Sequence, residues 1–296
     1  TLDLQANQLE HLPSGTHRLT SLKHLHLKYN HVMELPEDLG KLTNLEELDL
    51  ESNRISTLPS SCSKLQNLKK LYISRNHFAK LPSCIEKMVN IEELYLNDNS
   101  LTECQEVIHL TKLRTLNIST NTIKKLPKGL KHHSLLRDFD ASSNDISSID
   151  SLAPFDGFQT LQVLNLSGNH LSQIPAAIGK LPVLEKLSLS ENQLTSLPNE
   201  IGNLLSLLEL NLDENKLVRL PNELGAMKSL EVLHVNQNQL RDLPDEIYLL
   251  PLKMFGIDDN PFDDIPPNIT DGGSQEVFDY LGQRLQSGGA VTGNSS

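Results

Sequence analysis

Four carboxylates crowd one short stretch of the chain. The segment LEELDLESNRISTLP, residues 45–59, places Glu46, Glu47, Asp49 and Glu51 within six positions. Carboxylates this close together can ligate a hard cation such as Ca²⁺, and a pair of them can divide the roles of general acid and general base. Which chemistry is open to them depends on the structural element that carries them.

The stretch is one copy of a motif that recurs along the whole chain. Each full-length copy contains LxxLxLxxN, and most copies continue with a segment of the form LPxxIGxLxxL. A fixed period of this length is the sequence signature of a solenoid. The motif asparagine returns every 22 to 25 residues, twelve times in all, at Asn7, Asn30, Asn53, Asn76, Asn99, Asn121, Asn144, Asn169, Asn192, Asn215, Asn238 and Asn260.

The spacing of the leucines predicts the structure of each repeat. Leucines that alternate with polar residues form a short strand with one apolar face, which is buried when successive strands stack in parallel. The asparagines are expected to form a ladder that satisfies buried backbone groups. The second half returns as a short helical or 3₁₀ turn that begins near the proline and breaks at the glycine. We therefore predict an α/β solenoid, curved like a horseshoe, with its strands on the concave face and the turns on the convex face.

The two ends of the chain differ from the repeats. We expect twelve repeats over residues 1–270, the first of them truncated, a capping helix over 271–286 and a flexible tail or linker over 287–296. Because the chain opens inside a strand, we also expect a missing N-terminal cap or a second domain before it. The capping helix is predicted from one apolar stripe, made of Val277, Phe278, Leu281 and Leu285.

No catalytic or nucleotide-binding motif occurs in the sequence. Phosphate-binding loops, dinucleotide-binding glycine motifs and the zinc- and serine-hydrolase signatures are all missing. His24 and His26 lie two apart on one predicted strand, as a metal-binding pair could, but Lys23 and Lys28 beside them disfavour a cation. A solvent-facing pair is the favoured interpretation, and the two histidines at residues 132–133 are also expected at the surface. We therefore predict no catalytic, metal or cofactor site.

Composition narrows the class of partner. The net charge is −12, from 26 basic and 38 acidic residues, and such a surface repels phosphate backbones and anionic lipid, so no nucleic acid is expected. No apolar run approaches the roughly 20 residues that span a bilayer, so no membrane insertion is expected. The odd number of cysteines argues against a disulfide framework. Cys62, Cys84 and Cys104 fit small buried groups in a reducing, cytoplasmic compartment.

Outward strand side chains on the concave face are the candidate partner-binding residues. Their charge alternates between basic and acidic from repeat two to repeat five, and neighbouring strands ~4.8 Å apart allow exposed pairs worth ~0–1 kcal/mol each. Such pairs could neutralise the surface, and tyrosine also suits strands for structural reasons. A cluster of tyrosines ringed by charge nevertheless favours binding. The candidates are His24, His26, Lys28, Tyr29, Glu47, Asp49, Glu51, Lys70, Tyr72, Arg75, Glu93, Tyr95 and Asp98.

A second patch runs against the overall charge. Residues 112–137 contain seven basic residues and no acidic one. The patch could dock an acidic loop or a phosphopeptide, although a solvated face that keeps the chain soluble is the favoured interpretation. Its central residues lie on the turn and convex side and are Lys124, Lys125, Lys128 and Lys131.

The form of the repeat resembles a known class. The units LPNEIGNLLSL (197–207), LPNELGAMKSL (220–230) and IPAAIGKLPVL (174–184) are similar to the intracellular Ras-group leucine-rich repeats, the class of the Ras suppressor and Scribble/Erbin proteins. The ending NPFDDIPPNITDGGSQEVFDYLGQRL is similar to the closing segment of Ras-suppressor-like proteins. The resemblance implies a leucine-rich repeat solenoid that acts as a non-enzymatic adaptor, binds through its concave face and is often tied to small GTPases, kinases or phosphatases.

Together these patterns predict a monomeric scaffold or adaptor that binds a partner protein, with small-GTPase signalling as one setting that the resemblance implies. Two alternatives stay open. The chain could be the regulatory or targeting domain of a larger enzyme, such as a kinase, phosphatase, GTPase or ubiquitin ligase. Less favoured is an extracellular receptor ectodomain, which would carry glycans on the sequons at Asn117, Asn165, Asn268 and Asn294.

Overall fold

The computed structural model describes residues 1–13 and 15–291. It divides into two compact units, which are described separately. The first unit contains Thr1–Ile146 and Gly157–Leu161, and the second contains Ser147–Asp156 and the chain from Gln162 onward. Within the described residues, twelve short strands alternate with eleven 3₁₀ helices, and two α-helices follow them.

The elements have the following bounds. The strands are β1 (Leu2–Asp3), β2 (His24–His26), β3 (Glu47–Asp49), β4 (Lys70–Tyr72), β5 (Glu93–Tyr95), β6 (Thr115–Asn117), β7 (Asp138–Asp140), β8 (Val163–Asn165), β9 (Lys186–Ser188), β10 (Glu209–Asn211), β11 (Val232–His234) and β12 (Met254–Gly256). The 3₁₀ helices are η1 (Thr16–Arg18), η2 (Glu37–Lys41), η3 (Ser60–Lys64), η4 (Ser83–Lys87), η5 (Gln105–His109), η6 (Lys128–His132), η7 (Asp150–Leu152), η8 (Ala176–Lys180), η9 (Asn199–Asn203), η10 (Asn222–Ala226) and η11 (Asp245–Leu249). The α-helices are α1 (Pro267–Thr270) and α2 (Ser274–Val291).

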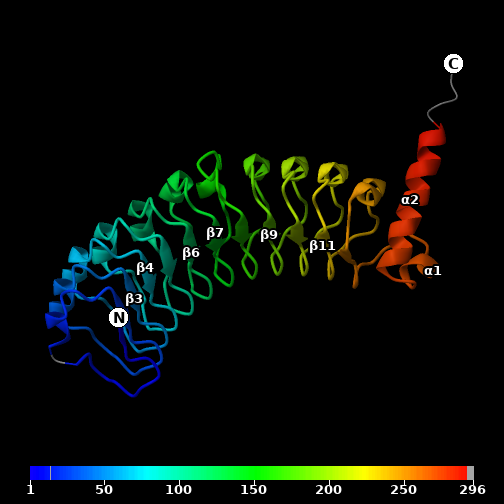
Figure 1. The fold of residues 1–296 in the computed structure, drawn as a ribbon. Coiled ribbons are helices and arrows are strands. Elements are labelled where there is room, and N and C mark those ends of the chain that lie inside the picture. Colours follow the sequence, from blue (N-terminus) through cyan, green and yellow to red (C-terminus); the bar gives the residue numbers. More distant parts are fainter. Residues whose placement is uncertain (14, 292–296) are drawn as a thin grey trace. The chain divides into compact units, whose positions relative to one another are not determined.

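Strands within each unit pair in parallel with the next strand of the chain, as the alternating leucines predict. In the first unit the register sets Leu25 against Leu48 and Leu48 against Leu71. These central residues are fully buried, whereas the residues on either side, such as Glu47 and Asp49, are half-buried. In Figure 1 the strands of each unit lie side by side. The predicted α/β solenoid is therefore confirmed, and the outward residues of β2–β7, with the second residue after each strand, are called the strand face.

The glycine of the repeat has a different role from the one that the sequence predicts. It lies inside the 3₁₀ helix, as Gly202 does in η9, and the helix continues for one more residue. A Cβ atom built on Gly202 would lie 2.3 Å from the carbonyl oxygen of Glu223 in the next repeat. Glycine is therefore needed because neighbouring turns approach too closely for a side chain, and the expectation that it breaks the turn is wrong.

The predicted asparagine ladder is present. The Nδ2 of Asn53 donates to the carbonyl oxygens of Leu27, at 2.9 Å, and Leu50, at 3.0 Å, while its Oδ1 accepts the N–H of Val32 at 3.0 Å. One side chain thus ties its own repeat to the preceding one. The same arrangement recurs with similar distances in the neighbouring repeats, for example at Asn76. Buried backbone groups that would cost ~1–3 kcal/mol each if unpaired are satisfied in this way.

Helix α2 packs against the last repeat of the second unit. Val277 and Leu281 are fully buried, and the ring of Phe278 lies 5.1 Å from that of Tyr248. The guanidinium of Arg284 forms a bidentate pair with Asp242, at 2.7 and 3.0 Å. The helix begins at Ser274 and continues past its expected end at residue 286 to Val291. Residues 292–296 of the expected tail lie outside the described residues.

His133 is a core residue, which corrects the expectation that it lies at the surface. Its side chain is fully buried, and its Nε2 lies 3.1 Å from the carbonyl oxygen of Val107. A carbonyl only accepts, so Nε2 carries the proton, and the buried Nδ1 has no hydrogen-bond partner among the described residues. Burial lowers the pKa of His133 below its usual 6.5. The sister positions hold Leu42, Leu65 and Met88, so the sequence alignment itself signalled a buried position.

Removal of one ladder side chain should destabilise the first unit. In an Asn121→Ala variant, the N–H of Leu101 and the carbonyl oxygens of Leu96 and Ile118 lose their side-chain partner. We expect the free energy of unfolding, measured by urea titration, to fall by about 3 kcal/mol. Asn7→Ala is the matched control, because Asn7 is exposed and water can replace it. Equal losses in the two variants would contradict the ladder as a buried constraint.

His133 should make the first unit acid-sensitive. Because the folded pKa lies below the unfolded one, the stability gained from the neutral ring is fully present above about pH 6.5 and is lost as the pH falls through the folded pKa. A His133→Leu variant should therefore have a flatter profile of unfolding free energy against pH, and should gain most over wild type under acid conditions. Exposed His132→Leu is the control. Parallel profiles for wild type and His133→Leu would contradict the prediction.

Candidate functional site

The carboxylates of residues 46–51 are engaged by the protein itself. Glu46 lies between two ammonium groups, Lys23 at 2.8 Å and Lys69 at 2.9 Å. Hydrogen bonds from Lys23 and Lys69 lower the pKa of Glu46 to about 2. Glu47 lies 3.0 Å from Nε2 of His26. These partners occupy the carboxylate oxygens that a metal ion would need.

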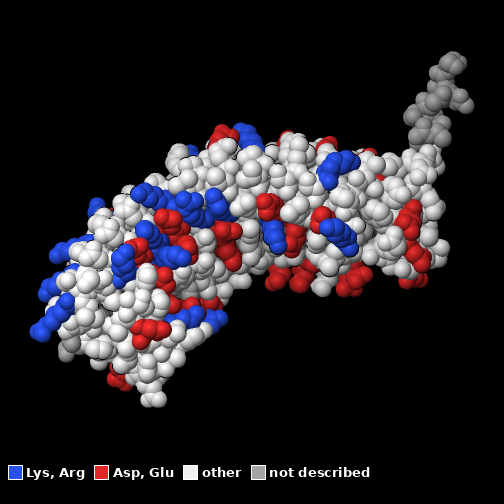
Figure 2. Space-filling view, viewed as in Figure 1, with Lys and Arg blue, Asp and Glu red and all other residues white. Residues whose placement is uncertain are grey.

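Pairs between neighbouring strands extend across the strand face. Lys28 contacts Glu51 at 2.7 Å, and Lys70 contacts Glu93 at 2.9 Å. The predicted cross-strand pairing is therefore confirmed, although Glu47 contacts a histidine instead of Lys70. Figure 2 shows acidic and basic side chains next to one another over the strands of the first unit. Half-exposed pairs of this kind contribute ~0–1 kcal/mol each, and each pair cancels its two charges locally.

Asp49 is the exception among the four carboxylates. It forms no ion pair within the described part of the chain, and its Oδ1 accepts the N–H of Glu51 at 3.0 Å. Burial raises the pKa of Asp49, against the opposing effect of that hydrogen bond. The third strand residue therefore caps the turn that follows it. The same bond occurs in five other repeats, where the acceptors are Asp3, Asn117, Asp140, Asn165 and Asn211.

Two adjacent repeats carry a tyrosine at the third strand position, where the six repeats just described carry a turn-capping aspartate or asparagine. Tyr72 and Tyr95 are cross-strand partners, and their rings stack with centroids 5.1 Å apart and planes 23° apart. The hydroxyl of Tyr72 donates to Glu93 at 3.1 Å, and Glu93 also holds Lys70. Burial, together with the nearby Glu93, raises the pKa of both phenols. Both rings therefore stay uncharged and are held in a fixed, half-exposed position.

Three candidate residues occupy the position directly before the ladder asparagine, which is the eighth position of LxxLxLxxN, and they lie beyond the strands. Tyr29, Arg75 and Asp98 follow three-residue strands and have φ angles of 56°, 54° and 55°. The left-handed conformation precedes the ladder asparagine in every repeat, with Gly168 as the one glycine at this position. The sequence did not reveal it, because nearly all of these residues are of types that rarely adopt it. The expectation that these three side chains project from a strand is wrong.

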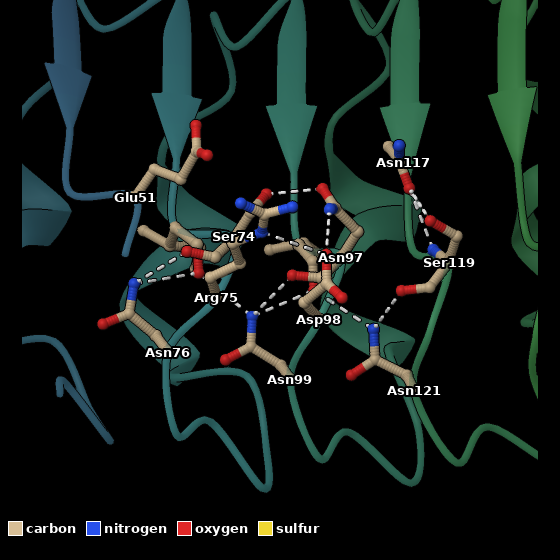
Figure 3. A network of polar contacts seen from close by, with 12 residues as sticks. Glu51, Ser74, Arg75, Asn76, Asn97, Asp98, Asn99, Asn117, Ser119 and Asn121 are labelled. Atoms are coloured by element: carbon tan, nitrogen blue, oxygen red, sulfur yellow. Dashed lines mark hydrogen bonds and ion pairs between the residues drawn. The ribbon is translucent and has the colours of Figure 1, made fainter. Parts of the chain in front are cut away.

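The turn residues form a network of their own. The hydroxyl of Ser74 donates to Oδ1 of Asn97 at 2.5 Å, and Nδ2 of Asn97 donates to Asp98 at 2.7 Å. Arg75 lies 3.7 Å from Asp98. Figure 3 shows this network beside the ladder asparagines and below the strands. Arg75 and Asp98 thus border the strand face, and the stacked tyrosines belong to the strands themselves.

The second candidate patch is largely exposed. Lys124, Lys125 and Lys128 are exposed, and Lys131 is half-buried. None of the four forms an ion pair within the described residues, which distinguishes them from the lysines of the strand face. Lys124, Lys125 and Lys128 also line a shallow groove of ≈ 560 Å³ with Thr102 and Gln105 among its other walls.

Metal-binding clusters and membrane-spanning helices are two other features that residues 1–13 and 15–291 could contain. Within them, no group of three or more histidine, cysteine, aspartate or glutamate side chains is arranged to hold a metal ion. No described helix is long and apolar enough to cross a bilayer. Cys62, Cys84 and Cys104 are buried free thiols, as the sequence predicts. Asn117 and Asn165, at two of the sequons, use their side-chain oxygens to cap Ser119 and Ser167.

Comparison with known proteins agrees with this geometry. A family model described as a leucine-rich repeat region matches residues 1–159 and 123–248. The chain belongs to the leucine-rich repeat family. A leucine-rich repeat protein of Leptospira interrogans has a similar structure, with 30% identity, a TM-score of 0.77 and coverage of 92% of this chain and 74% of that one. YopM from Yersinia enterocolitica also has 30% identity, with a TM-score of 0.67 and coverage of 88% and 52%.

More distant structures share the fold alone. An internalin from Listeria monocytogenes has 23% identity, a TM-score of 0.72 and coverage of 90% of this chain and 83% of that one. Among curated proteins no significant match was found. Leucine-rich repeat proteins are in general binding modules, not enzymes, so the fold is that of a protein-interaction domain.

The paired carboxylates allow a direct test of the site electrostatics. Carbon-detected NMR titration should find Glu46 ionising with a pKa of about 2. Because the folded pKa is lowered, any stability from these pairs is present above the unfolded pKa and is lost as the pH falls through the folded one. The pKa should rise toward 4.5 in a Lys23→Ala/Lys69→Ala variant. Lys41→Ala, a lysine that pairs elsewhere with Asp38, is the control, and an unchanged pKa in the double variant would refute the assignment.

Proposed function

We propose that the first unit binds a partner protein on the strand face between β2 and β5, and that Tyr72 and Tyr95 are its anchors. The observation that carries the proposal is the stacked tyrosine pair at positions where six other repeats hold a turn-capping aspartate or asparagine. Two large rings there contribute no turn cap, and their half-exposed faces are available to a ligand. Rigid aromatic side chains of this kind dominate the energetics of many interfaces.

The surrounding charges support this role. Glu93 fixes the Tyr72 hydroxyl and Lys70 together, so the ring is held before a partner arrives, which reduces the entropy lost on binding. The remaining candidates, which are polar or charged, surround the tyrosines as a polar rim that sets specificity. They are His24, His26, Lys28, Glu47, Asp49, Glu51 and, at the border, Tyr29, Arg75 and Asp98.

The type of repeat supports a proposal for the cellular setting. The LPxxIGxL unit and the buried free thiols favour a non-enzymatic cytoplasmic adaptor of the Ras-group class, with a small GTPase or a signalling enzyme as its partner. A regulatory domain of a larger enzyme uses the same surface and is the second candidate. Glycans on Asn117 and Asn165 would compete with the turn caps that these side chains form, which disfavours an ectodomain.

The lysine patch is proposed as a secondary contact for an acidic segment. The observation in its favour is that four basic side chains, Lys124, Lys125, Lys128 and Lys131, have no carboxylate partner within the described part of the chain. A charge-reversed variant, Lys124→Glu/Lys125→Glu/Lys128→Glu, should then weaken binding and remove its salt dependence.

Affinity purification with mass spectrometry tests the main proposal. A Tyr72→Ala/Tyr95→Ala variant should lose the partner that wild type retains, because the anchors are gone. Its stability should fall by no more than about 2 kcal/mol, since one stacked pair and one surface hydrogen bond are lost. The control removes exposed apolar surface from the second unit with Leu205→Ala/Val218→Ala, residues that are 61% and 46% exposed. The proposal would be overturned if partners still bound the tyrosine variant but no longer bound the control variant.

A further inference from the structure

The strand face of the first unit is acidic once its internal pairs are counted. The outward residues of β2–β7, with the second residue after each strand, carry six carboxylates and two ammonium groups, a net charge of −4 with the histidines neutral. Glu47, Glu51 and Glu93 are each engaged by a basic side chain. The remaining three form no ion pair within the described part of the chain, and they are Asp49, Asp138 and Asp140.

The strand register places two of these carboxylates on either side of the tyrosines. Reading along the third strand position, Asp49 pairs with Tyr72, Tyr72 with Tyr95, Tyr95 with Asn117 and Asn117 with Asp140. The row therefore holds an acid, two stacked rings, an amide and an acid. Strands are spaced by ~4.8 Å, so the two acids lie roughly 19 Å apart. Asp138, at the first position of β7, lies beside Asp140 on the same strand.

We propose, on the basis of the binding role assigned above to the tyrosine pair, that the partner presents an extended basic segment to this row. One arginine or lysine of the segment contacts Asp49, a second contacts Asp140 and Asp138, and the residue between them packs on Tyr72 and Tyr95. About six residues of extended chain, at ~3.4 Å each, cover the distance between the two acids.

The chemistry of the row favours arginine at these contacts. A guanidinium forms two parallel hydrogen bonds with a carboxylate and also stacks on an aromatic ring. A cation over an exposed tyrosine contributes ~0.5–1 kcal/mol and more where water is excluded. Lys28 lies near Asp49 but pairs with Glu51, so the half-buried Asp49, which forms no ion pair within the described residues, can pair directly with a cation supplied by the partner. An acidic or phosphorylated segment would meet uncompensated repulsion at both ends of the row.

The chain itself suggests how to remove the charge without disturbing the fold. Asn117, Asn165 and Asn211 form the same turn cap with an amide oxygen that Asp49 and Asp140 form with a carboxylate. An Asp49→Asn/Asp140→Asn variant therefore keeps both caps and removes two charges.

The matched control is Glu10→Gln/Glu34→Gln. It makes the same change in net charge at two exposed positions of the first unit outside the strands. Circular dichroism and urea titration of both variants check that the fold is intact.

A phage library of random peptides of about twelve residues, long enough to cover the row, is selected on the purified chain. We expect enrichment of pairs of arginine or lysine separated by about six residues, with an aromatic or apolar residue between them. Affinity of the selected peptides, measured by calorimetry, should fall about tenfold or more in Asp49→Asn/Asp140→Asn and should be unchanged in the control.

Three results would overturn the inference: enrichment of acidic residues, no enrichment at all, or equal affinity for the wild type and the aspartate variant. The Tyr72→Ala/Tyr95→Ala variant distinguishes failure of this inference from failure of the proposed function. Peptides that depend on the tyrosines but carry no basic residues leave the proposed function standing and refute the basic segment. Peptides that bind the tyrosine variant as tightly as wild type refute both.

Discussion

Backbone groups buried at the end of each strand are the constraint on which this structure depends. The chain turns sharply after every three-residue strand, and the carbonyl and N–H groups inside the turn face the core, where no water can reach them. One asparagine per repeat satisfies them, and it does so across two repeats at once, as Asn53 does with Leu27 of the preceding repeat and Leu50 of its own. Because each amide needs the preceding repeat in place, the ladder fixes the distance and register between strands within each unit.

That register leaves the outward side chains of the strands free of any role in the core. Apolar side chains, mostly leucine, fill the buried strand positions, whereas the positions beside them vary from histidine to glutamate to tyrosine. Equivalent outward positions of neighbouring strands lie directly beside one another. A strand with basic side chains therefore lies next to a strand with acidic side chains, and most of these charges form ion pairs within the protein. The surface features that remain are the stacked Tyr72 and Tyr95 and the carboxylates that no cation engages. We therefore assign the proposed binding function to the side chains that do not take part in these internal ion pairs.

Several positions serve local structure where residue type alone suggested function. Asp49 caps a turn, as an asparagine does at the same position of other repeats, so a carboxylate there is partly structural. Gly202 lies within its 3₁₀ helix because the next repeat approaches closely, and His133 fills a leucine position in the core. The roles of Gly202 and His133 depend on a neighbouring repeat. The motif within one repeat contains no information about that neighbour's distance.

The sequence by itself determined the architecture, because the period of the leucines and asparagines leaves one way to bury them. Strand positions, the parallel stacking, the ladder and the apolar stripe of the last helix all follow from spacing within a single repeat or helix. Only the tertiary structure decided which outward residues pair and which stay available, since that depends on atoms brought together from different repeats. It also decided the left-handed residue before each ladder asparagine, because the closed turn imposes that conformation on tyrosine, arginine and glutamate alike. The ring-to-ring contact of Tyr72 and Tyr95 was implied by their shared column, but their geometry and their bond to Glu93 required the folded chain.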